Sequence, residues 1–462
     1  MLLPELYLFL CAVFFLILSI AKKRVPILAV ARWLSVIGLF ITIFGLHAQG
    51  ELFAGAYRVD FFSQIFKLLL MIGLCLVICS FKRTDELEPA YLPEYFMFLV
   101  FSTLGLMLLV SAVELMTIVV SLEISSFSLY VIVPLRREQT KIQLEAAMKY
   151  FFFGALATGL MLYGMGYLYG MTHSTYLAVI MPQLAPFLTR PLGILALALT
   201  LTAFFFKLSL FPLHFWAPDI YEGASNGTTA FIATVPKIAA TALLLRLVRL
   251  ASDAPGELAA IMLILAAFSM TLGNLAGLVQ KDVKRLLAYS GIAHAGYLLM
   301  GLLASNREAG AAVIYYVTVY LVMNLACFYV LLVLSQHGEN VTLTDLTGLS
   351  QRSPLLAFTL AVAAFSLAGI PPTGGFTGKL FLFISAFRGG YLLIVLIGAI
   401  NAVIAMFYYL NLVRLSYARE AAGRNAIALT LYEKVFCYLS NIGMIGLGLA
   451  PFGLLELFRR AM

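Results

Sequence analysis

The chain has 462 residues, of which 63% are hydrophobic and only 11% are charged. No soluble domain has this balance, so the composition excludes a soluble enzyme or binding protein and predicts an integral membrane protein. The net charge of +8 does not indicate a nucleic-acid partner, because the Lys and Arg residues lie between apolar segments, where they set orientation in the membrane. The apolar runs have the length of helices, which predicts an all-α polytopic membrane protein.

The sequence contains no pattern for a cofactor or a metal. Its five cysteines lie inside apolar runs without metal-ligand or disulfide spacing. There is also no P-loop, no G-x-G-x-x-G after a strand, and no cysteine pattern for haem or an iron–sulfur cluster. We therefore expect this chain to hold no redox centre of its own.

About 14 apolar segments of roughly 20 residues each predict the transmembrane helices. They lie near residues 2–20, 27–47, 59–80, 94–110, 112–133, 145–170, 190–211, 228–250, 257–279, 285–304, 309–335, 354–388, 391–413 and 432–455. The first segment lacks a basic start and a cleavage site, so we expect a retained helix and not a signal peptide.

Two of these segments are interrupted. In the seventh, Pro212 breaks the apolar run of FFFKLSLFPLHFWAPDIYEG, and a polar loop follows. The twelfth, residues 354–388, would be about 52 Å long as one helix, which is more than a bilayer needs. Its centre reads AGIPPTGGFTGK, which predicts two half-helices joined by unwound backbone. Interruptions that lie five helices apart indicate two inverted repeats with a site at the midplane.

This symmetry predicts four parts of the chain. We expect an N-terminal three-helix segment at residues 1–93, a first inverted repeat of helices 4–8 at 94–250, a second of helices 9–13 at 251–415, and a C-terminal helix 14 at 416–462. Roughly 16 Lys and Arg residues follow the odd-numbered helices and roughly 8 lie on the other side. The richer side is predicted to be cytoplasmic, with both termini outside. It carries the basic clusters at 22–24, 82–83, 136–137 and 284–285.

Two charges lie deep in apolar helices. Glu123 is at the middle of VVSLEISSFSLY, and Lys207 lies at comparable depth with no charge nearby in sequence. A bare ammonium in hydrocarbon costs about 2.5–3.5 kcal/mol even on a lenient insertion scale. A carboxylate beside the lysine favours its charged form and a distant one favours the neutral form, so the pair can act as a proton switch. The alternative is a static ion pair that fixes helix packing, but apolar residues often replace such pairs without loss. Glu114, near the start of the same helix, is expected to face headgroups.

Two further groups lie near the middle of the bilayer. Lys237 follows Pro236 in TAFIATVPKIAA and has no acidic partner in its own segment or the next. A desolvated lysine loads and releases protons near neutral pH, which favours a relay over a side chain that reaches to the interface. His294 lies about 15 Å past Lys284 along its helix, and histidine titrates in the useful range. The alternative for His294 is a hydrogen-bonded core residue.

Other charges complete the candidate path. Lys379 opens the second half-helix after the unwound PPTGG segment, where freed backbone groups need polar partners, so we expect an entry or exit station there rather than a structural cation. Glu145 and Lys149 form an i, i+4 pair at the mouth of the sixth helix, with a secondary role or simple helix-end stabilisation. His214, beside the break, fits either role. Lys67 is expected to reach the interface with its ammonium.

These residues stand in stretches that resemble the antiporter-like subunits of respiratory complex I. FKLSLFPLHFWAPDIYEG and TAFIATVPKIAA look like the two lysine helices of that family, and QKDVKRLLAYSGIAHAGY looks like its signature after the ninth span. AGIPPTGGFTGKLFLF is similar to the twelfth helix of the N-type subunits, whereas the M-type is expected to carry glutamate where Lys379 stands. The resemblance covers roughly residues 55–415, and SNGTTAF departs from the proline-containing run that the family usually shows.

The resemblance implies a function and a role for each residue. Glu123 and Lys207 would be a coupled pair, Lys237 the central relay and Lys379 the terminal one. The chain would be a proton-translocating subunit of NADH-quinone oxidoreductase in a bacterial inner membrane, with FMN, iron–sulfur clusters and quinone in partner subunits. These partners would be the antiporter-like subunits M and L and the small subunits K, J, A and H, together with phospholipid.

Two alternatives belong to other classes of protein. A subunit of a cation/proton antiporter or of a membrane-bound hydrogenase would share the Glu–Lys–Lys core, and the co-purifying subunits would distinguish it. A passive membrane scaffold would tolerate lysine-to-methionine changes without losing transport.

Overall fold

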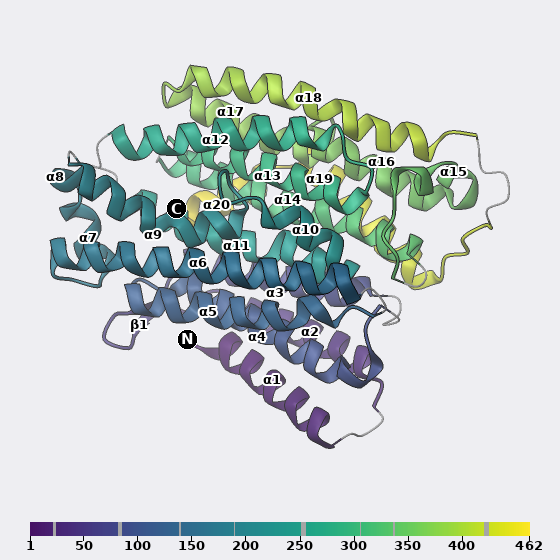
Figure 1. The fold of residues 1–462 in the computed structure, drawn as a ribbon, viewed down its shortest axis with the longest axis horizontal. Coiled ribbons are helices and arrows are strands. Elements are labelled where there is room, and N and C mark those ends of the chain that lie inside the picture. Colours follow the sequence, from purple (N-terminus) through teal and green to yellow (C-terminus); the bar gives the residue numbers. More distant parts are fainter. Residues whose placement is uncertain are drawn as a thin grey trace.

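Most of the long helices run side by side along one direction, as a bundle that crosses a membrane would (Figure 1). The computed structural model describes residues 1–21, 25–81, 86–137, 140–188, 190–250, 256–304, 306–335, 338–419 and 425–462. The predicted basic clusters at 22–24 and 82–83 lie outside the described residues. Within the described ranges, the all-α prediction is confirmed apart from one short hairpin.

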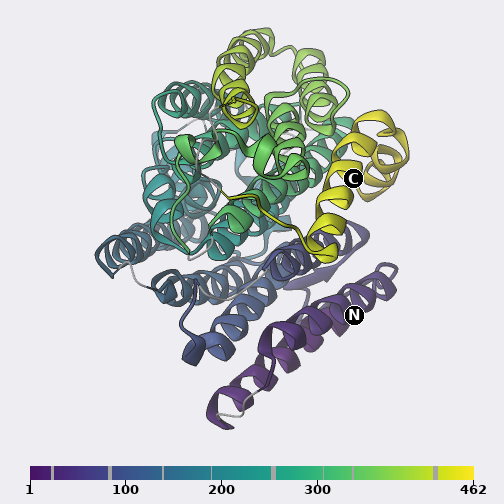
Figure 2. The ribbon, with the colours of Figure 1, turned by 90° about the vertical axis from the view of Figure 1, so that its right-hand side faces the viewer.

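The first part of the chain forms eight helices, two 3-10 turns and the hairpin. These are α1 (Leu3–Ala21), α2 (Ile27–Phe44), β1 (Gly50–Leu52), β2 (Tyr57–Val59), α3 (Phe61–Ser80), η1 (Pro89–Tyr91), α4 (Leu92–Ser111), α5 (Leu115–Ile132), η2 (Val133–Leu135), α6 (Thr140–Thr172), α7 (Leu177–Gln183) and α8 (Ala185–Leu188). The strands pair antiparallel, with Gly50 opposite Val59. Figure 2 shows the N-terminal helices, coloured purple, along one edge of the bundle.

The second part holds the broken helices and the centre of the bundle. Its elements are α9 (Pro191–Leu208), α10 (Trp216–Gly223), α11 (Asn226–Leu250), α12 (Gly256–Gly277), α13 (Val283–Leu302), α14 (Arg307–Leu334), η3 (Leu343–Leu346), α15 (Leu349–Arg352), α16 (Pro354–Ala368), α17 (Gly374–Arg388), α18 (Leu392–Ser416), α19 (Leu431–Leu449) and α20 (Phe452–Ala461).

Both predicted helix breaks are present. The helix with Lys207 ends at Leu208, and a loop leads to the short helix α10. The twelfth segment divides into α16 and α17, which are separated by residues 369–373. Each first half ends with a residue in the left-handed region, Ser209 at φ 61° and Gly369 at φ 88°. This conformation turns the chain out of the helix and lets the next amide hydrogen-bond back to the last turn.

The count of fourteen spans is not confirmed. Among the described residues, eleven helices are long and apolar enough to cross a membrane, or up to twelve if α19 and α20 count as one. Three predicted spans account for the difference. Helix α13 has the length but carries several polar residues, α16 and α17 have 15 residues each, and α20 bends away from α19 by 79°.

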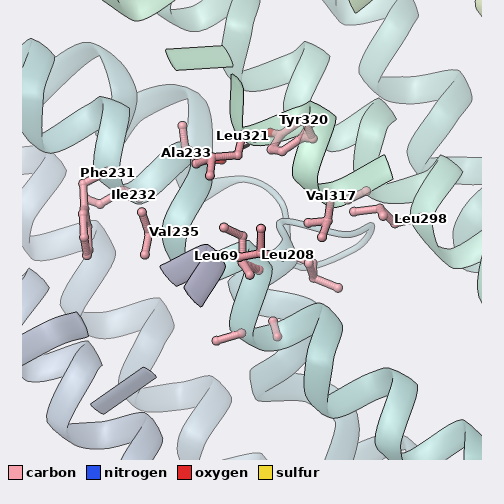
Figure 3. Packing of buried hydrophobic residues seen from close by; sticks show 14 of the residues in the cluster. Leu69, Leu208, Phe231, Ile232, Ala233, Val235, Leu298, Val317, Tyr320 and Leu321 are labelled. Carbon is pink, nitrogen blue, oxygen red and sulfur yellow. Dashed lines mark hydrogen bonds between the residues drawn. The ribbon is translucent and has the colours of Figure 1, made fainter. Parts of the chain in front are cut away.

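The core of the bundle lies around α11 and α14. The central window of α11 is completely buried, and that of α14 is 89% buried. Helix α11 packs against α3, α14 and α9, and Figure 3 shows buried residues from each: Val235 of α11, Leu69 of α3, Leu321 of α14 and Leu208 of α9. This burial means that polar groups on α11 face protein and not lipid.

Candidate functional site

Lys207 lies in the last turn of α9, buried beneath aromatic rings. Its side chain is 4% exposed, and its ammonium lies 5.8 Å from the centroid of the Tyr150 ring. Trp216, in the helix after the break, stacks on the same tyrosine at 5.0 Å and donates a hydrogen bond from its indole to the Phe206 carbonyl. The ammonium itself has no hydrogen-bond partner within the described residues.

Glu123 is hydrogen-bonded to a residue other than Lys207. Its carboxylate accepts a hydrogen bond of 2.7 Å from the Thr158 hydroxyl on α6. No ion pair joins Glu123 and Lys207 in the described part of the chain, so their role as a proton switch stays a prediction.

Within the described residues, the hydrogen bonds of Lys237 go to neutral groups. The helix α11 holds it at the centre of the bundle, where it is 1% exposed. Its ammonium donates to the Gly291 carbonyl at 3.2 Å and to the Tyr320 hydroxyl at 3.4 Å. Glycine at position 291 leaves room for the ammonium, since a Cβ atom there would lie 2.8 Å from its nitrogen. Among the residues described, no acidic side chain forms an ion pair with Lys237.

His294 is held between two tyrosines. Its Nδ1 atom is 2.5 Å from the Tyr316 hydroxyl, and its Nε2 atom is 3.2 Å from the Tyr409 hydroxyl. Tyr409 also hydrogen-bonds Ser290, one turn earlier on α13. Both ring nitrogens therefore have a phenol that can donate or accept, which suits a core histidine and a proton relay equally. The two tyrosines come from α14 and α18, far from His294 in sequence.

Lys379 caps the first half of the broken helix. Its ammonium donates to the carbonyls of Leu367 and Ala368 at 2.8 and 3.0 Å. These are the last carbonyls of α16, which no amide of the helix can satisfy and which form its negative end. The Tyr297 ring lies below the ammonium at 4.9 Å. Lys379 therefore supplies the polar partner that the backbone at this break was expected to need.

Helix α13 links these groups. It carries the carbonyl of Gly291, which accepts from Lys237, then His294, and then Tyr297, whose ring faces Lys379. These three α13 residues follow one another at intervals of three, so they lie along one face of the helix. Lys237, His294 and Lys379 therefore all lie along α13. Lys207 lies apart from them, among the aromatic rings described above.

A charge network surrounds α10 at one end of the bundle. The predicted Glu145–Lys149 pair forms at 2.7 Å, and Lys149 also contacts Asp219 at 2.6 Å. Arg285 bridges Asp219 and Glu222 at 2.8 and 2.7 Å. Burial alone would raise the pKa of the Asp219 carboxyl, but the two basic neighbours hold it below its ordinary value. No spacing in the sequence links Asp219 to Lys149 or Arg285.

The expectation for Lys67 is wrong. Its ammonium does not reach the interface: the side chain is fully buried and forms an ion pair of 2.7 Å with Glu5 of α1. The Tyr57 hydroxyl donates to the same carboxylate at 2.6 Å. The partner could not be found from local spacing, because the helix start that carries Glu5 is distant in sequence.

Glu114 and His214 have surroundings that suit a structural role. Glu114 is mostly buried and caps α5, where it accepts from the amide and the hydroxyl of Thr117 at 2.7 and 2.9 Å. It does not face headgroups as a free charge. His214 is 2% exposed and lies against Phe215, with ring centroids 4.2 Å apart. No charged partner of His214 occurs in the described ranges.

Known proteins resemble this chain over most of its length. The model of the family described as "NADH:quinone oxidoreductase/Mrp antiporter, TM" matches residues 112–405, which is more than half of the chain. This chain belongs to that family. A relative in the family, NADH-quinone oxidoreductase subunit N 2 of Opitutus terrae, is 44% identical over 97% of this chain and 95% of the relative. Subunit N 2 of Solidesulfovibrio magneticus is 45% identical over 91% of this chain and 89% of that protein.

Solved structures of the family share the fold. A chain of respiratory complex I from Thermus thermophilus with bound aureothin superposes with a TM-score of 0.84, at 31% identity over 98% of both chains. A chain of an archaeal membrane-bound sulfane sulfur reductase gives 0.89 at 21% identity, covering 99% of this chain and 96% of that one. A chain of the Mrp complex from Dietzia gives 0.86 at 19% identity, with the same coverage. At such identities the last two likenesses show the fold alone.

Proposed function

We propose that this family member is an N-type, antiporter-like membrane subunit of an NADH-quinone oxidoreductase, and that it moves protons across a bacterial inner membrane. The relatives at 44% and 45% identity carry that subunit's name. Partner subunits, the antiporter-like M and L and the small K, J, A and H, would hold the FMN, iron–sulfur clusters and quinone site, and phospholipid would surround the assembly.

A set of buried basic groups without ion pairs carries the proposal. Lys207, Lys237 and Lys379 are each at most 4% exposed, and no salt bridge joins any of them in the described part of the chain. A permanent charge in such surroundings is costly, whereas a lysine that gains and loses a proton carries its charge only for part of the time. Three such lysines in one membrane protein are typical of ion translocation and not of packing.

The proton path that we propose follows the order of these groups in the bundle. Glu123 favours the charged form of Lys207 in one state of the complex, and a change in the neighbouring subunit alters that balance. Lys237 receives the proton next. His294 and its two phenol partners then connect Lys237 to Lys379 along α13, and Glu145 with Lys149 has a secondary role at the mouth.

Replacement of Lys237 tests the proposal. In the purified complex reconstituted in liposomes, Lys237→Met is expected to lower proton transport about 100-fold, the effect of removing a group that transfers protons. Lys281→Met is the matched control, because Lys281 is an exposed lysine in a loop near α13. Full proton stoichiometry in Lys237→Met or in Lys207→Ala would show that these lysines do not carry protons.

The subunits that co-purify with this chain test the assignment to NADH-quinone oxidoreductase. Native mass spectrometry of the complex from its own membrane should find flavin, iron–sulfur and quinone-reductase subunits. Hydrogenase subunits, or small antiporter partners alone, would assign the chain to the alternative class of antiporter or hydrogenase complexes. The fold does not separate these classes, since the sulfane sulfur reductase and Mrp chains superpose as well as the complex I chain.

The orientation and the internal repeats are also part of the proposal. The excess of Lys and Arg beside the odd-numbered predicted spans supports a cytoplasmic location of the Arg136 and Lys284 ends and an external location of both termini. The two breaks, each after a left-handed residue, support inverted repeats at 94–250 and 251–415, between an N-terminal segment at 1–93 and a C-terminal one at 416–462. Accessibility of single cysteines to an impermeant reagent would test the orientation.

A further inference from the structure

The short connection between α10 and α11, which we call the α10–α11 joint (residues 222–226), is held by buried charges. The guanidinium of Arg136 donates to the carbonyls of residues 222, 223 and 224 at 2.8, 3.3 and 3.4 Å. It also donates to the Gly338 carbonyl. The ammonium of Lys284 donates to the Ala224 carbonyl at 2.9 Å. Two cations therefore hold the chain where α10 ends.

An acidic group holds the other side of the joint. Glu86 accepts from the backbone amide of Asn226 at 2.7 Å and from its side-chain amide at 2.8 Å. Asn226 is the first residue of α11, so the carboxylate satisfies an amide that the helix leaves free. Burial raises the pKa of Glu86 above its ordinary value, although Asn226 and the charge of Lys284 oppose that shift.

The signs of these charges match the two helix ends. Cations lie at the negative, C-terminal end of α10, and the anion lies at the positive, N-terminal end of α11. Glu86, Arg136 and Lys284 are only 6%, 3% and 0% exposed. They come from three separate places: the loop before α4, the residue after η2, and the first turn of α13. Buried ions are costly unless opposite charges compensate them, so removing Glu86 leaves two buried cations without this carboxylate.

Helices α11 and α13 also build the Lys237 site. Lys237 lies about three turns beyond Asn226 on α11, and Gly291, which accepts from it, lies about two turns beyond Lys284 on α13. The adjacent Arg285 contacts Asp219 and Glu222 on α10. The cluster therefore fixes where α11 and α13 start relative to each other and to α10.

From this arrangement we infer that Glu86, Arg136 and Lys284 form a positioning site for proton translocation, which sets the register of α11 against α13 and so the place of Lys237. This inference rests on the proposed function. The three residues act through Lys237 and are not themselves relays.

The test uses charge balance in the intact complex. Glu86→Gln keeps the size of the side chain but leaves Arg136 and Lys284 without their buried anion. Proton export per assembled complex, measured with a pH-sensitive dye in NADH-energised vesicles, is expected to fall roughly threefold or more. Lys284→Met should also lower it. The double variant, which removes one charge of each sign, is expected to recover most of the loss. Glu88→Gln is the matched control, because Glu88 is half-exposed and pairs with Arg137 at 3.8 Å.

Each outcome decides the question. A purely structural cluster would lower the amount of assembled complex while export per complex stayed normal, and that result overturns the inference. The inference is also overturned if proton export per complex is no higher in the double variant than in the single variants. If Glu86→Gln does not assemble, Asn226→Ser removes one hydrogen bond without changing charge, and normal export per complex in that variant overturns it as well. Normal export in Lys237→Met would instead reject the proposed function.

Discussion

The surroundings of Lys237 predict the effect of one methyl group. A Cβ atom added at Gly291 would lie 2.8 Å from the Lys237 ammonium and 3.1 Å from the Tyr320 hydroxyl. The first distance requires the flexible end of Lys237 to move away from the Gly291 backbone, to whose carbonyl it now donates at 3.2 Å, and the second requires only a small shift of Tyr320. Alanine stabilises a helix by up to about 1 kcal/mol relative to glycine, while a hydrogen bond from a charged group contributes about 1.5–3 kcal/mol. Gly291→Ala is thus expected to keep the fold and displace the ammonium.

The assay for Gly291→Ala is proton export per NADH oxidised in the reconstituted complex. We expect a loss of about tenfold, because a misplacement of about 1 Å in a reacting group reduces rates by up to about a hundredfold. Gly159→Ala is the matched control, since an added Cβ there has no atom within 4 Å. Normal export from an assembled Gly291→Ala complex would show that the position of the Lys237 ammonium does not govern transport, and would refute the reasoning.

Three further predictions concern other charges. Lys379→Met leaves two carbonyls at the end of α16 without their donor, so we expect it to destabilise the break by about 1–3 kcal/mol per carbonyl. Amide hydrogen exchange at the break should become faster. Unchanged exchange would contradict the capping role. Glu5→Gln leaves the buried Lys67 unpaired and is expected to destabilise the folded chain by about 3–5 kcal/mol, whereas Glu5→Leu with Lys67→Met should melt near the wild-type temperature. If the wild type, Glu5→Gln and the double variant melted at the same temperature, the result would argue against a strong ion pair. Burial alone would raise the pKa of Asp60, but Arg246 and Ser63 lower that pKa below its ordinary value. The stability that Asp60 provides is therefore present above about pH 4 and is lost as the pH falls through the lowered pKa. Asp60→Asn should remove that part of the acid sensitivity in a melting series, and an unchanged series would contradict it.

The breaks and the buried charges were open to prediction because their signals are local. Proline and glycine interrupt a helix wherever they stand, and a lysine in an apolar run is visible without any knowledge of contacts. The positions of Lys207, Lys237 and Lys379 in the bundle follow from these signals. Their expected roles depend on transport and are not read from the structure.

The partners of the charges were not open to prediction, because they come from distant segments. Glu5 pairs with Lys67, two tyrosines from separate helices hold His294, and Glu86 accepts from Asn226, which lies 140 residues later in the sequence. No periodicity links such positions. The count of fourteen spans is not confirmed, in part because α13, which its neighbours bury, carries polar residues that a lipid-facing helix of the same length would avoid.

The left-handed ends of α9 and α16 have one more consequence. Both half-helices end inside the bundle, so two negative helix poles lie within the protein, at Ser209 and at Gly369. A buried negative pole attracts a cation and repels an anion such as chloride or hydroxide. The backbone itself therefore gives the interior of this chain a preference for positive charge, and it does so without an acidic side chain at either break.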